Sequence, residues 1–295
     1  MHLLSITSLS DSQLTQLFAT AHEYARDREA GRGRLAGRTI FNVFYENSTR
    51  TAMSFAQAAA RLGAQAITLS VEHSSIKKGE TLADTARTLE AMGPDVLVLR
   101  HRQNGAADEV AALVDCPVVN AGDGTNEHPT QALLDALTLL QHFGSLEGRT
   151  VAICGDIRHS RVAHSNALLL PRLGATVRLA GPPALLPADT GSLSMNEAID
   201  GADAVMMLRV QRERLDEDLG DAPGEYLRQY GLTAERLERA RPDAVVLHPG
   251  PMNRGVEIAD EIADLPSRSL ILRQVANGVA MRMAVLEMLV SAGQP

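Results

Sequence analysis

The chain has 295 residues, which is enough for one large domain or two domains of medium size with a substantial core. Its formal net charge of −8 argues against general nucleic-acid binding, so any anionic ligand must be held by positive charge that is gathered locally. No basic signal region or membrane span is expected, and Cys116 and Cys154 lack metal-ligand spacing, so we expect buried free thiols in a cytoplasmic protein.

Apolar residues at helical spacing predict a first helix over residues 11–28, with Ser10 or Asp11 as its N-cap. Strands and helices then alternate. Strands are predicted at 39–45, 66–70, 96–100, 117–120, 150–154, 176–180, 204–208 and 244–247. Helices are predicted at 52–62, 81–92, 106–113, 129–143, 162–173, 234–239 and 274–291. Residues 211–231 are charged and contain Gly and Pro, and we expect a mobile surface loop there.

Two successive sets of β/α units predict an α/β fold with two doubly wound parallel sheets, joined by the long helix at 129–143. In such sheets, ligands bind outside the carboxyl ends of the strands. Polar and basic side chains follow seven of the predicted strands. An edge of this kind, facing a cleft between two domains, suits a small substrate that carries several negative oxygens.

An apolar run at residues 41–44 leads through Glu46 and Asn47 into Ser48, Thr49, Arg50 and Thr51 and then into an Ala-rich segment. This pattern predicts a strand, a turn and the N-terminus of a helix, where unpaired N–H groups and the macrodipole favour an anion. Ser48 or Thr49 could simply cap the helix, but capping needs one hydroxyl and leaves Arg50 unexplained. We therefore interpret the turn as a site for phosphate.

His128 and Gln131 are three residues apart at the start of the 129–143 helix, so both can point the same way. A neutral imidazole at a helix N-terminus can donate to a carbonyl oxygen that becomes an oxyanion. The alternative is that His128 is an ordinary residue before Pro129.

In the second half, Arg161 and Arg209 each follow a strand, and two such residues suit two carboxylates. A single exposed arginine would need no ligand, and the turn at 77–80 could be an ordinary solvated one. No Ser-His-acid triad, Cys-His pair or carboxylate cluster is evident. A site made of donors favours positioning and electrostatic stabilisation over covalent catalysis.

With these residues assembled, the chain resembles the aspartate carbamoyltransferases of the aspartate/ornithine carbamoyltransferase superfamily, the catalytic chains of pyrimidine synthesis. The resemblance runs nearly end to end and rests on six motifs in the same order. They are Phe-Tyr-Glu-Asn-Ser-Thr-Arg-Thr at 44–51, Ser-Ile-Lys-Lys-Gly-Glu-Thr at 75–81, Gly-Thr-Asn-Glu-His-Pro-Thr-Gln at 124–131, Asp-Ile-Arg-His-Ser-Arg-Val at 156–162, Leu-Arg-Val-Gln-Arg-Glu-Arg at 208–214 and His-Pro-Gly-Pro-Met-Asn-Arg-Gly at 248–255.

The resemblance implies roles for the matching positions. The phosphate of carbamoyl phosphate would be held by Ser48, Thr49, Arg50, Thr51 and Arg100. The carbonyl oxygen would receive hydrogen bonds from Thr51, Arg100 and His128. The carbamoyl amide would be fixed by Gln131 and the backbone of Pro249. The carboxylates of L-aspartate would be bound by Arg161 and Arg209, with help from Gln211, Lys78 and the backbone of Gly250.

The resemblance also implies a homotrimer, because a loop from a neighbouring subunit, here carrying Ser74 and Lys78, completes each site in the family. Residues 1–130 with a returning helix at 275–295 would form the carbamoyl-phosphate-binding domain, and 131–274 the aspartate-binding domain. The amine of aspartate would attack the carbamoyl carbon directly, without metal or cofactor. Docking to a regulatory chain or a second pathway enzyme stays open. Gly250 stands where some members of the family have Leu, so only backbone contacts carry over there.

Two alternatives remain. An ornithine carbamoyltransferase would share the first half, but it needs an acidic partner for the substrate ammonium and usually has a Cys in the turn at 248–251. This chain has Arg209 and Gln211 in the second half and no Cys in that turn. A catalytically inactive binding protein is the other alternative, although every donor position of the active family is occupied.

Overall fold

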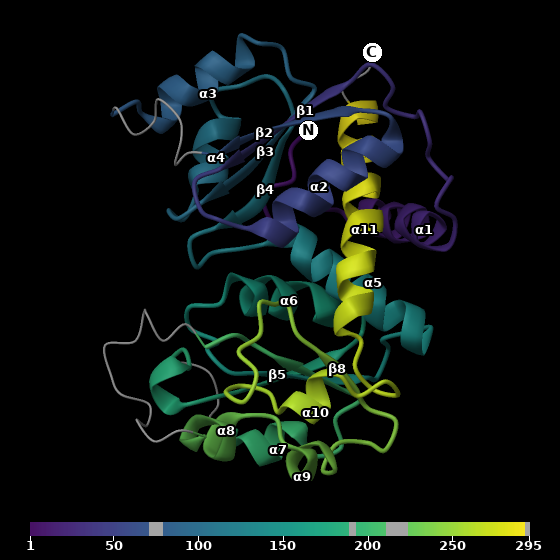
Figure 1. Cartoon of the computed structure of the whole chain (residues 1–295), viewed down its shortest axis with the longest axis vertical. Helices are drawn as coiled ribbons and strands as arrows, with labels where there is room; N and C mark the ends of the chain where they lie inside the picture. The colour runs from purple at the N-terminus through teal and green to yellow at the C-terminus, as the bar shows by residue number, and fades with distance from the viewer. Residues whose placement is uncertain (71–78, 189–192, 211–223, 293–295) are drawn as a thin grey trace. The chain divides into compact units, whose positions relative to one another are not determined.

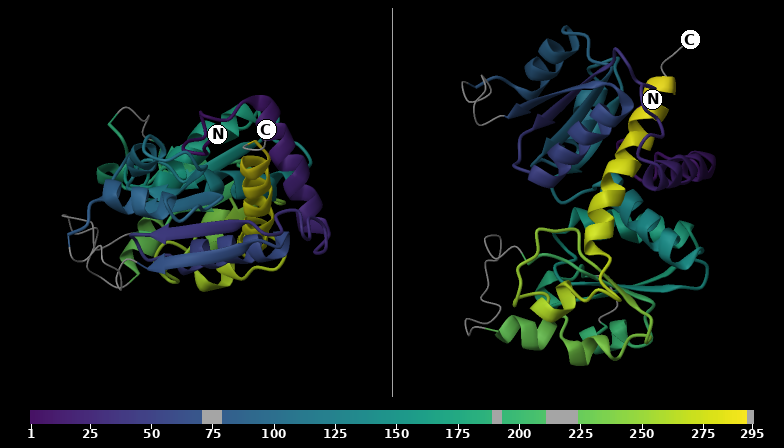
Figure 2. Two further views of the ribbon diagram at one scale, coloured as in Figure 1. Left: turned by 90° about the horizontal axis from the view of Figure 1, so that it is seen from above. Right: turned by 45° about the vertical axis from the view of Figure 1, so that its right-hand side comes forward.

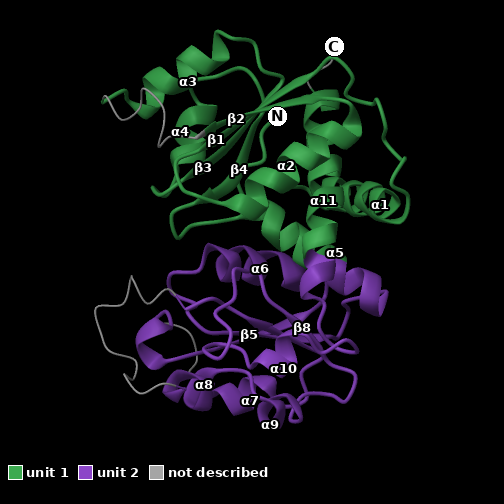
Figure 3. Ribbon diagram, viewed as in Figure 1, with its two compact units in different colours: residues 1–137, 275–295 green, residues 138–274 purple. Residues whose placement is uncertain are grey.

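A computed structural model describes residues 1–70, 79–188, 193–210 and 224–292 of the chain (Figure 1). The chain divides into two compact units, which are Met1–Leu137 with Val275–Pro295 (unit 1) and Thr138–Gln274 (unit 2) (Figure 3). Along the sequence, helix α5 (Pro129–Phe143) and helix α11 (Ile271–Ala292) each run from one unit into the other.

Unit 1 is built on a four-stranded parallel sheet with the strand order β2-β1-β3-β4. The strands are β1 (Thr39–Phe44), β2 (Gln65–Ser70), β3 (Val96–His101) and β4 (Val118–Asp123). The helices are α1 (Asp11–Arg26), α2 (Thr49–Leu62), α3 (Leu82–Glu90) and α4 (Ala106–Ala111), together with the first part of α5 and most of α11. Figure 2 shows α2 and α11 on the same side of this sheet.

The sequence of unit 1 explains its local structure. Five consecutive residues of β1, from Ile40 to Phe44, are buried, as expected for a strand that is covered on both faces. Helix α2 turns Phe55, Ala58 and Leu62 inward, and Gly63 ends the helix in the left-handed conformation at φ 81°. Ser10 caps α1 in a reciprocal capping box with Gln13, so the N-cap predicted there is confirmed.

Unit 2 repeats the same strand order as β6-β5-β7-β8, again with parallel pairing throughout. The strands are β5 (Thr150–Cys154), β6 (Thr176–Ala180), β7 (Ala204–Met207) and β8 (Val245–Leu247). The helices are α6 (Arg161–Arg172), η3 (Pro183–Leu185), α7 (Met195–Ile199), α8 (Glu225–Tyr230), α9 (Ala234–Leu237) and α10 (Asp260–Ala263). The predicted α/β fold with two parallel sheets and a last helix that returns to the first unit is confirmed.

One expectation was wrong within residues 211–231. Residues 225–230 form helix α8 instead of continuing as a loop. The helix forms because Tyr226 is buried and its ring lies 5.5 Å from that of Tyr230, so one side of the segment belongs to the core. Residues 211–223 lie outside the described part of the chain.

Helix α11 is long and apolar enough to cross a membrane by length and composition, which the sequence expectation had excluded. Core helices pass the same test, and 61% of the most apolar window of α11 is buried in the protein. Glu287 on α11 accepts hydrogen bonds from Tyr24 of α1 and from Arg34, the latter at 2.8 Å. The contacts therefore identify α11 as a core helix of unit 1.

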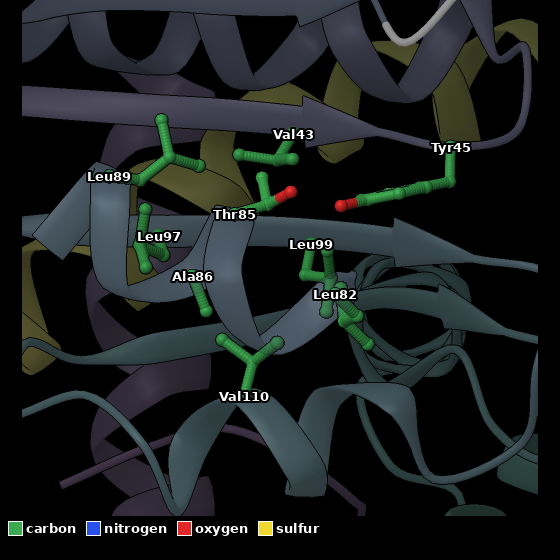
Figure 4. A pocket seen from close by; sticks show the side chains of 9 residues that line it. All are labelled: Val43, Tyr45, Leu82, Thr85, Ala86, Leu89, Leu97, Leu99 and Val110. Atoms are coloured by element: carbon green, nitrogen blue, oxygen red, sulfur yellow. The ribbon is translucent and has the colours of Figure 1, made fainter. Parts of the chain in front are cut away.

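Two smaller features complete the description. Both cysteines are free thiols; Cys154 is buried as expected, but Cys116 is only half-buried. A cavity of about 10 Å³, with room for no more than about one water, lies between β1, β3, α3 and α4. Tyr45 and Thr85 both line this cavity, and their hydroxyls point toward each other (Figure 4). The other lining side chains are apolar. An apolar lining does not suit an anionic substrate, so this cavity is not a candidate site.

Candidate active site

The predicted site residues that the structure describes fall at the carboxyl ends of the two sheets, one group in each unit. In unit 1 they follow β1, β3 and β4, which are successive neighbours in the sheet. In unit 2 they follow β5, β7 and β8, which are also successive neighbours. The predicted residues Ser74, Lys78 and Gln211 lie outside the described residues.

The turn after β1 is built around the first turn of α2. The helix begins at Thr49, three residues earlier than predicted, so Thr49, Arg50 and Thr51 form its first turn and Ser48 is its N-cap. The first intrahelical bond runs from Ala52 N to Ser48 O at 3.1 Å, which leaves the preceding N–H groups directed out of the helix end. Within the described chain, the Ser48 hydroxyl makes no capping hydrogen bond, and the first turn carries no acidic residue.

This first turn therefore has the properties of an anion site. Arg50 and Thr49 are exposed, Ser48 is half-buried and Thr51 is buried. A guanidinium at the positive end of a helix dipole is unfavourable unless a negative group binds between them. The explanation that Ser48 merely caps the helix is not supported.

Arg100 lies beside this turn, since Phe44 and Arg100 are partners in the β1–β3 register. Its Nε lies 3.2 Å from Oε2 of Glu46, and its Nη1 donates to Ala121 O at 3.2 Å. Only 12% of the side chain is exposed. Contacts from both neighbouring strands thus fix the guanidinium at the sheet edge, where a rigid donor fork suits phosphate or a carbonyl oxygen.

The loop from β4 to α5 is organised by the buried carboxylate of Asp123. It accepts hydrogen bonds from Gly105 N at 2.7 Å, Asn126 Nδ2 at 3.0 Å and Glu127 N at 3.1 Å. Gly124 has φ 48°, and a Cβ there would lie 1.9 Å from Asn104 Oδ1. This rigid loop delivers His128, whose side chain is buried, to the start of α5.

Gln131 is the third residue of α5 and is also buried. Its backbone N donates to His128 O at 2.9 Å, so the two residues lie three positions apart in the first turn of the helix. Its Nε2 donates to Oδ1 of Asp135 at 2.8 Å. His128 and Gln131 are therefore brought together as predicted, at the end of the strand next to Arg100.

In unit 2, Arg161 is the first residue of α6, directly after the turn that follows β5. Ser160 caps this helix by accepting from Ala163 N at 3.1 Å, and the first turn has no acidic residue. Arg161 thus stands at a second positive helix end. Like Arg50, it is in a position where an anion lowers the electrostatic energy.

Arg209 follows β7, the strand next to β5, and is half-buried. Leu208 N still donates to Cys154 O at 2.8 Å, so the ends of the two strands remain side by side up to Arg209. Arg161 and Arg209 therefore come from adjacent strand ends. Two guanidinium groups in such an arrangement can bind a ligand with two carboxylates.

The turn after β8 is held by a buried pair, His248 and Glu257, whose side chains have no exposed surface. Nδ1 of His248 accepts from Gly250 N at 2.8 Å, so the proton of the neutral ring is on Nε2, which lies 3.3 Å from Glu257. Glu257 also accepts from Asn253 N. Gly250 has φ 65°, which explains why glycine is suited to this place.

The same turn is tied to the Arg209 segment. Asn253 Nδ2 donates to Val210 O at 3.2 Å, next to Arg209 in the chain. The backbones of Pro249 and Gly250 are half-buried at this edge and can offer a carbonyl oxygen and little else. In the described ranges, no group of three or more His, Cys, Asp or Glu side chains is placed to hold a metal ion.

Sequence reasoning missed the residues that support these donors, namely Asp123, Asp135, Glu257 and Arg282. One signal was available, because Asp135 is the single acidic residue in the apolar segment 129–143. Buried charged residues are rare unless they are paired. A lone charge inside a helix that is apolar on all sides therefore predicts a partner elsewhere in the chain.

Comparisons with known proteins find relatives of both halves of the chain. Residues 1–141 match the family model for the aspartate/ornithine carbamoyltransferase carbamoyl-P binding domain, and 147–289 match that for the Asp/Orn binding domain. The aspartate carbamoyltransferase catalytic subunit of Granulibacter bethesdensis is 54% identical over 297 residues, covering 98% of this chain and 94% of the relative.

Solved structures of such enzymes resemble the fold of this chain over nearly its whole length. Aspartate transcarbamoylase from Trypanosoma cruzi, in complex with carbamoyl aspartate and phosphate, has a TM-score of 0.88 and 34% identity, covering 98% of this chain and 95% of that one. Ornithine carbamoyltransferase from Pyrococcus furiosus has a TM-score of 0.88 at 26% identity, covering 100% and 98%.

Proposed function

This chain belongs to the aspartate/ornithine carbamoyltransferase family, and we propose that it is an aspartate carbamoyltransferase. It transfers the carbamoyl group of carbamoyl phosphate to the amino group of L-aspartate, giving N-carbamoyl-L-aspartate and phosphate for pyrimidine biosynthesis. Catalytic-subunit relatives of that name, more than half identical over nearly the whole chain, support the choice.

Unit 1 binds carbamoyl phosphate in this proposal. The phosphate takes hydrogen bonds from the first turn of α2, that is from Ser48, Thr49, Arg50 and Thr51, and from Arg100. Thr51, Arg100 and His128 donate to the carbonyl oxygen. The NH₂ group of the substrate donates to Gln131 and to the carbonyl of Pro249. The uncapped hydroxyl of Ser48 and the clamped guanidinium of Arg100 support this assignment.

Unit 2 binds L-aspartate through Arg161 and Arg209, with Gln211, the Gly250 backbone and Lys78 in support. The observation that carries the choice of aspartate is the pair of arginines at the adjacent ends of β5 and β7. Ornithine would need a carboxylate for its side-chain ammonium. The turn after β5 does contain a carboxylate, that of Asp156. It is buried and lies 3.0 Å from His159 Nδ1, so it is already engaged within the protein.

The chemistry follows from a site made of donors. The neutral amine of aspartate attacks the carbamoyl carbon, a C–N bond forms, and negative charge develops on the carbonyl oxygen that Thr51, Arg100 and His128 stabilise. The C–O bond to phosphate then breaks, and the departing phosphate accepts the proton that the new nitrogen loses. This step needs no protein nucleophile, metal or organic cofactor.

The proposed active form is a cytoplasmic homotrimer. Ser74 and Lys78 of one subunit complete the site of its neighbour, so a monomer would lack two of the donors. Residues 1–130 with 275–295 form the carbamoyl-phosphate-binding domain and residues 131–274 the aspartate-binding domain, with Gln131 itself contacting the carbamoyl group. A larger assembly with a regulatory chain or another pathway enzyme is compatible with this scheme. Nucleic acid and membranes are not partners.

The test is phosphate release from carbamoyl phosphate with L-aspartate and L-ornithine in parallel, on protein whose oligomeric mass is known from light scattering. Turnover that depends on aspartate, from a trimer or a multiple of it, is expected. The Arg209→Met variant should lose aspartate-dependent turnover at the aspartate concentration that half-saturates the wild type.

Each other outcome points to a specific error. Turnover with ornithine alone would overturn the assignment of Arg209 and of unit 2. Absence of turnover from a folded trimer that still binds phosphate would support a binding protein instead of an enzyme. Full activity in a monomer would refute the shared site.

A further inference from the structure

Helices α5 and α11 of unit 1 carry two buried residues of opposite charge that the reaction above does not use. Asp135 on α5 has no exposed surface, and Arg282 on α11 is only 3% exposed. Nη2 of Arg282 lies 3.5 Å from Oγ1 of Thr130, and Nη1 donates to Gly278 O at 3.3 Å. The guanidinium also lies over the ring of Phe55 of α2, 5.1 Å from its centre. The Arg282 guanidinium thus lies next to Thr130, the residue directly before Gln131 in the chain.

Asp135 contacts Gln131 directly, because it accepts the hydrogen bond from Nε2 of Gln131 at 2.8 Å. An ionised carboxylate has no hydrogen to donate, so only the NH₂ side of the Gln131 amide can face it. The other side of the same amide, the carbonyl oxygen Oε1, is then turned away from Asp135. Asp135 therefore decides which of the two ends of the amide can be offered to a ligand.

Arg282 keeps Asp135 in the form that makes this choice. Burial lowers the pKa of Arg282 to about 10, and the charge of Asp135 opposes this lowering, so the guanidinium is still positive at neutral pH. A carboxyl group without exposed surface would otherwise tend to stay protonated. A protonated Asp135 could donate its own hydrogen and would accept the Gln131 amide in either orientation.

We propose that Asp135, held as a carboxylate by Arg282, is a specificity-determining positioning residue that sets Gln131 to accept a hydrogen bond from the substrate. The inference rests on the proposed function, in which Gln131 meets the NH₂ group of carbamoyl phosphate. A carbamoyl group brings N–H donors to this position, whereas an acetyl group brings a methyl. Asp135 thereby selects a carbamoyl phosphate over an acyl phosphate of the same shape, without touching either.

The test compares carbamoyl phosphate with acetyl phosphate, which differs from it only at this point, and with inorganic phosphate, which lacks the acyl group. KM is measured for carbamoyl phosphate, and Ki, competitive with it, for acetyl phosphate and for inorganic phosphate. In Asp135→Asn, the side-chain oxygen turns toward the positive charge of Arg282, its NH₂ group faces Gln131, and the Gln131 amide inverts.

We expect the preference for carbamoyl phosphate over acetyl phosphate to fall about tenfold, which corresponds to roughly 1.4 kcal/mol or one hydrogen bond. The Ki values of acetyl phosphate and inorganic phosphate should stay within about twofold. A merely structural role would weaken all three ligands together, and that result, like an unchanged preference, would overturn the proposal.

Three further variants distinguish a specific loss of this preference from a general effect of the substitution on the fold. Asp203→Asn removes the charge from a buried aspartate in unit 2, which lies 2.7 Å from the half-buried Arg149, and should leave the preference unchanged. Arg282→Lys keeps the positive charge and should also retain it. If the single substitution Asp135→Asn destabilises the fold by leaving Arg282 without its counter-charge, Asp135→Asn with Arg282→Met removes both charges. That double variant should lose about threefold of the preference, and full retention would refute the role of Asp135.

The proposed function and this inference fail in different ways. A wild-type protein without aspartate-dependent turnover would refute the function. A wild-type protein with that turnover, whose Asp135 variants keep the full preference for carbamoyl over acetyl phosphate, would refute only the inference.

Discussion

The two units contain the same strand–turn–helix element at the same place in the same sheet. β1 leads into α2 in unit 1 and β5 leads into α6 in unit 2, each from the second strand of a sheet with equivalent order. Both helices carry an arginine and no acidic residue in the first turn. They differ in their N-caps. Ser160 bonds to its own helix, while Ser48, among the described residues, makes no such bond.

This difference matches the two ligands that we assign. A phosphate group offers more oxygens than a carboxylate. A helix end whose hydroxyls and N–H groups are not used in capping can donate hydrogen bonds to several of them. A carboxylate offers two oxygens, and one guanidinium fork satisfies both. The helix of unit 2 can therefore cap itself and leave recognition to Arg161. We therefore attribute the difference between the two assigned anions to the turns, since the two sheets have equivalent strand orders.

The largest expected effect is a loss of turnover with almost no loss of substrate binding. His128 belongs to the unit 1 edge, where we place the developing oxyanion, and no residue of unit 2 has that role. His128→Ala should lower kcat by about 10²–10³, the usual loss for one oxyanion donor, with the affinity for carbamoyl phosphate nearly unchanged. Steady-state kinetics together with phosphate inhibition would measure both quantities. Unchanged turnover would remove His128 from the mechanism.

The next largest expected effect is on the binding of L-aspartate, which we assign to unit 2. Arg161→Met and Arg209→Met should each raise the KM for L-aspartate about 10- to 100-fold, since a hydrogen bond to a charged group contributes about 1.5–3 kcal/mol. The Ki for inorganic phosphate should stay the same, because phosphate binds to unit 1. Arg172→Met, at the exposed opposite end of α6, is the matched control and should change neither value. Equal weakening of aspartate and phosphate would contradict the division of labour between the units.

How far the sequence predicts this molecule depends on the range of the interactions involved. The bounds of α5, β5 and β6 were predicted residue by residue, because Pro129, Gly144 and strong apolar runs define them locally. The helices α7, α8 and α10 were missed, since segments of four to six residues are too short to show a helical period. Helix α2 starts at Thr49, three residues before the predicted start, and no capping side chain marks that position.

The donors of the site were predictable for a similar reason. Arg100, His128, Arg161 and Arg209 each stand at or just after the end of a strand, and the rule for parallel sheets places such residues at one edge. Their supports were only partly predictable, because the isolated Asp135 predicts a buried partner but does not identify it. Asp135 and Arg282 are 147 positions apart in the sequence, and nothing local links them. A single sequence thus identifies the groups that we assign to the substrate more readily than the buried groups behind them.

A smaller effect addresses the two N-caps directly. Ser160→Ala should lower the free energy of unfolding by about 1 kcal/mol, the usual contribution of a capping hydroxyl, while Ser48→Ala should cost only a few tenths. The order should reverse for phosphate, with Ki rising about fivefold for Ser48→Ala and staying constant for Ser160→Ala. Urea unfolding and inhibition kinetics on the same two variants give all four numbers. Equal losses of stability would show that Ser48 caps α2 after all.

The smallest effect concerns pH at the unit 1 edge, where His101 ends β3 and packs edge-to-face against Tyr45, with ring centres 4.6 Å apart and ring planes at 65°. Burial lowers the pKa of His101 from its usual 6.5, against the opposing charges of Glu109 and Glu46. Nδ1 accepts from Gln103 N at 3.0 Å, a bond that protonation would break.

Because the unfolded chain takes up the His101 proton more readily, the stability from the neutral ring is complete above about pH 6.5 and is lost as the pH falls through the lower folded value. Solvent screening of the half-exposed ring limits the loss to less than about 1 kcal/mol. The equivalent strand in unit 2, β7, ends at Met207, which does not titrate. His101→Gln should therefore reduce the loss of stability between pH 7.5 and about pH 5, measured by urea unfolding. An unchanged pH dependence in that variant would mean that the titration lies elsewhere, since His2 and His142 also have a lowered pKa.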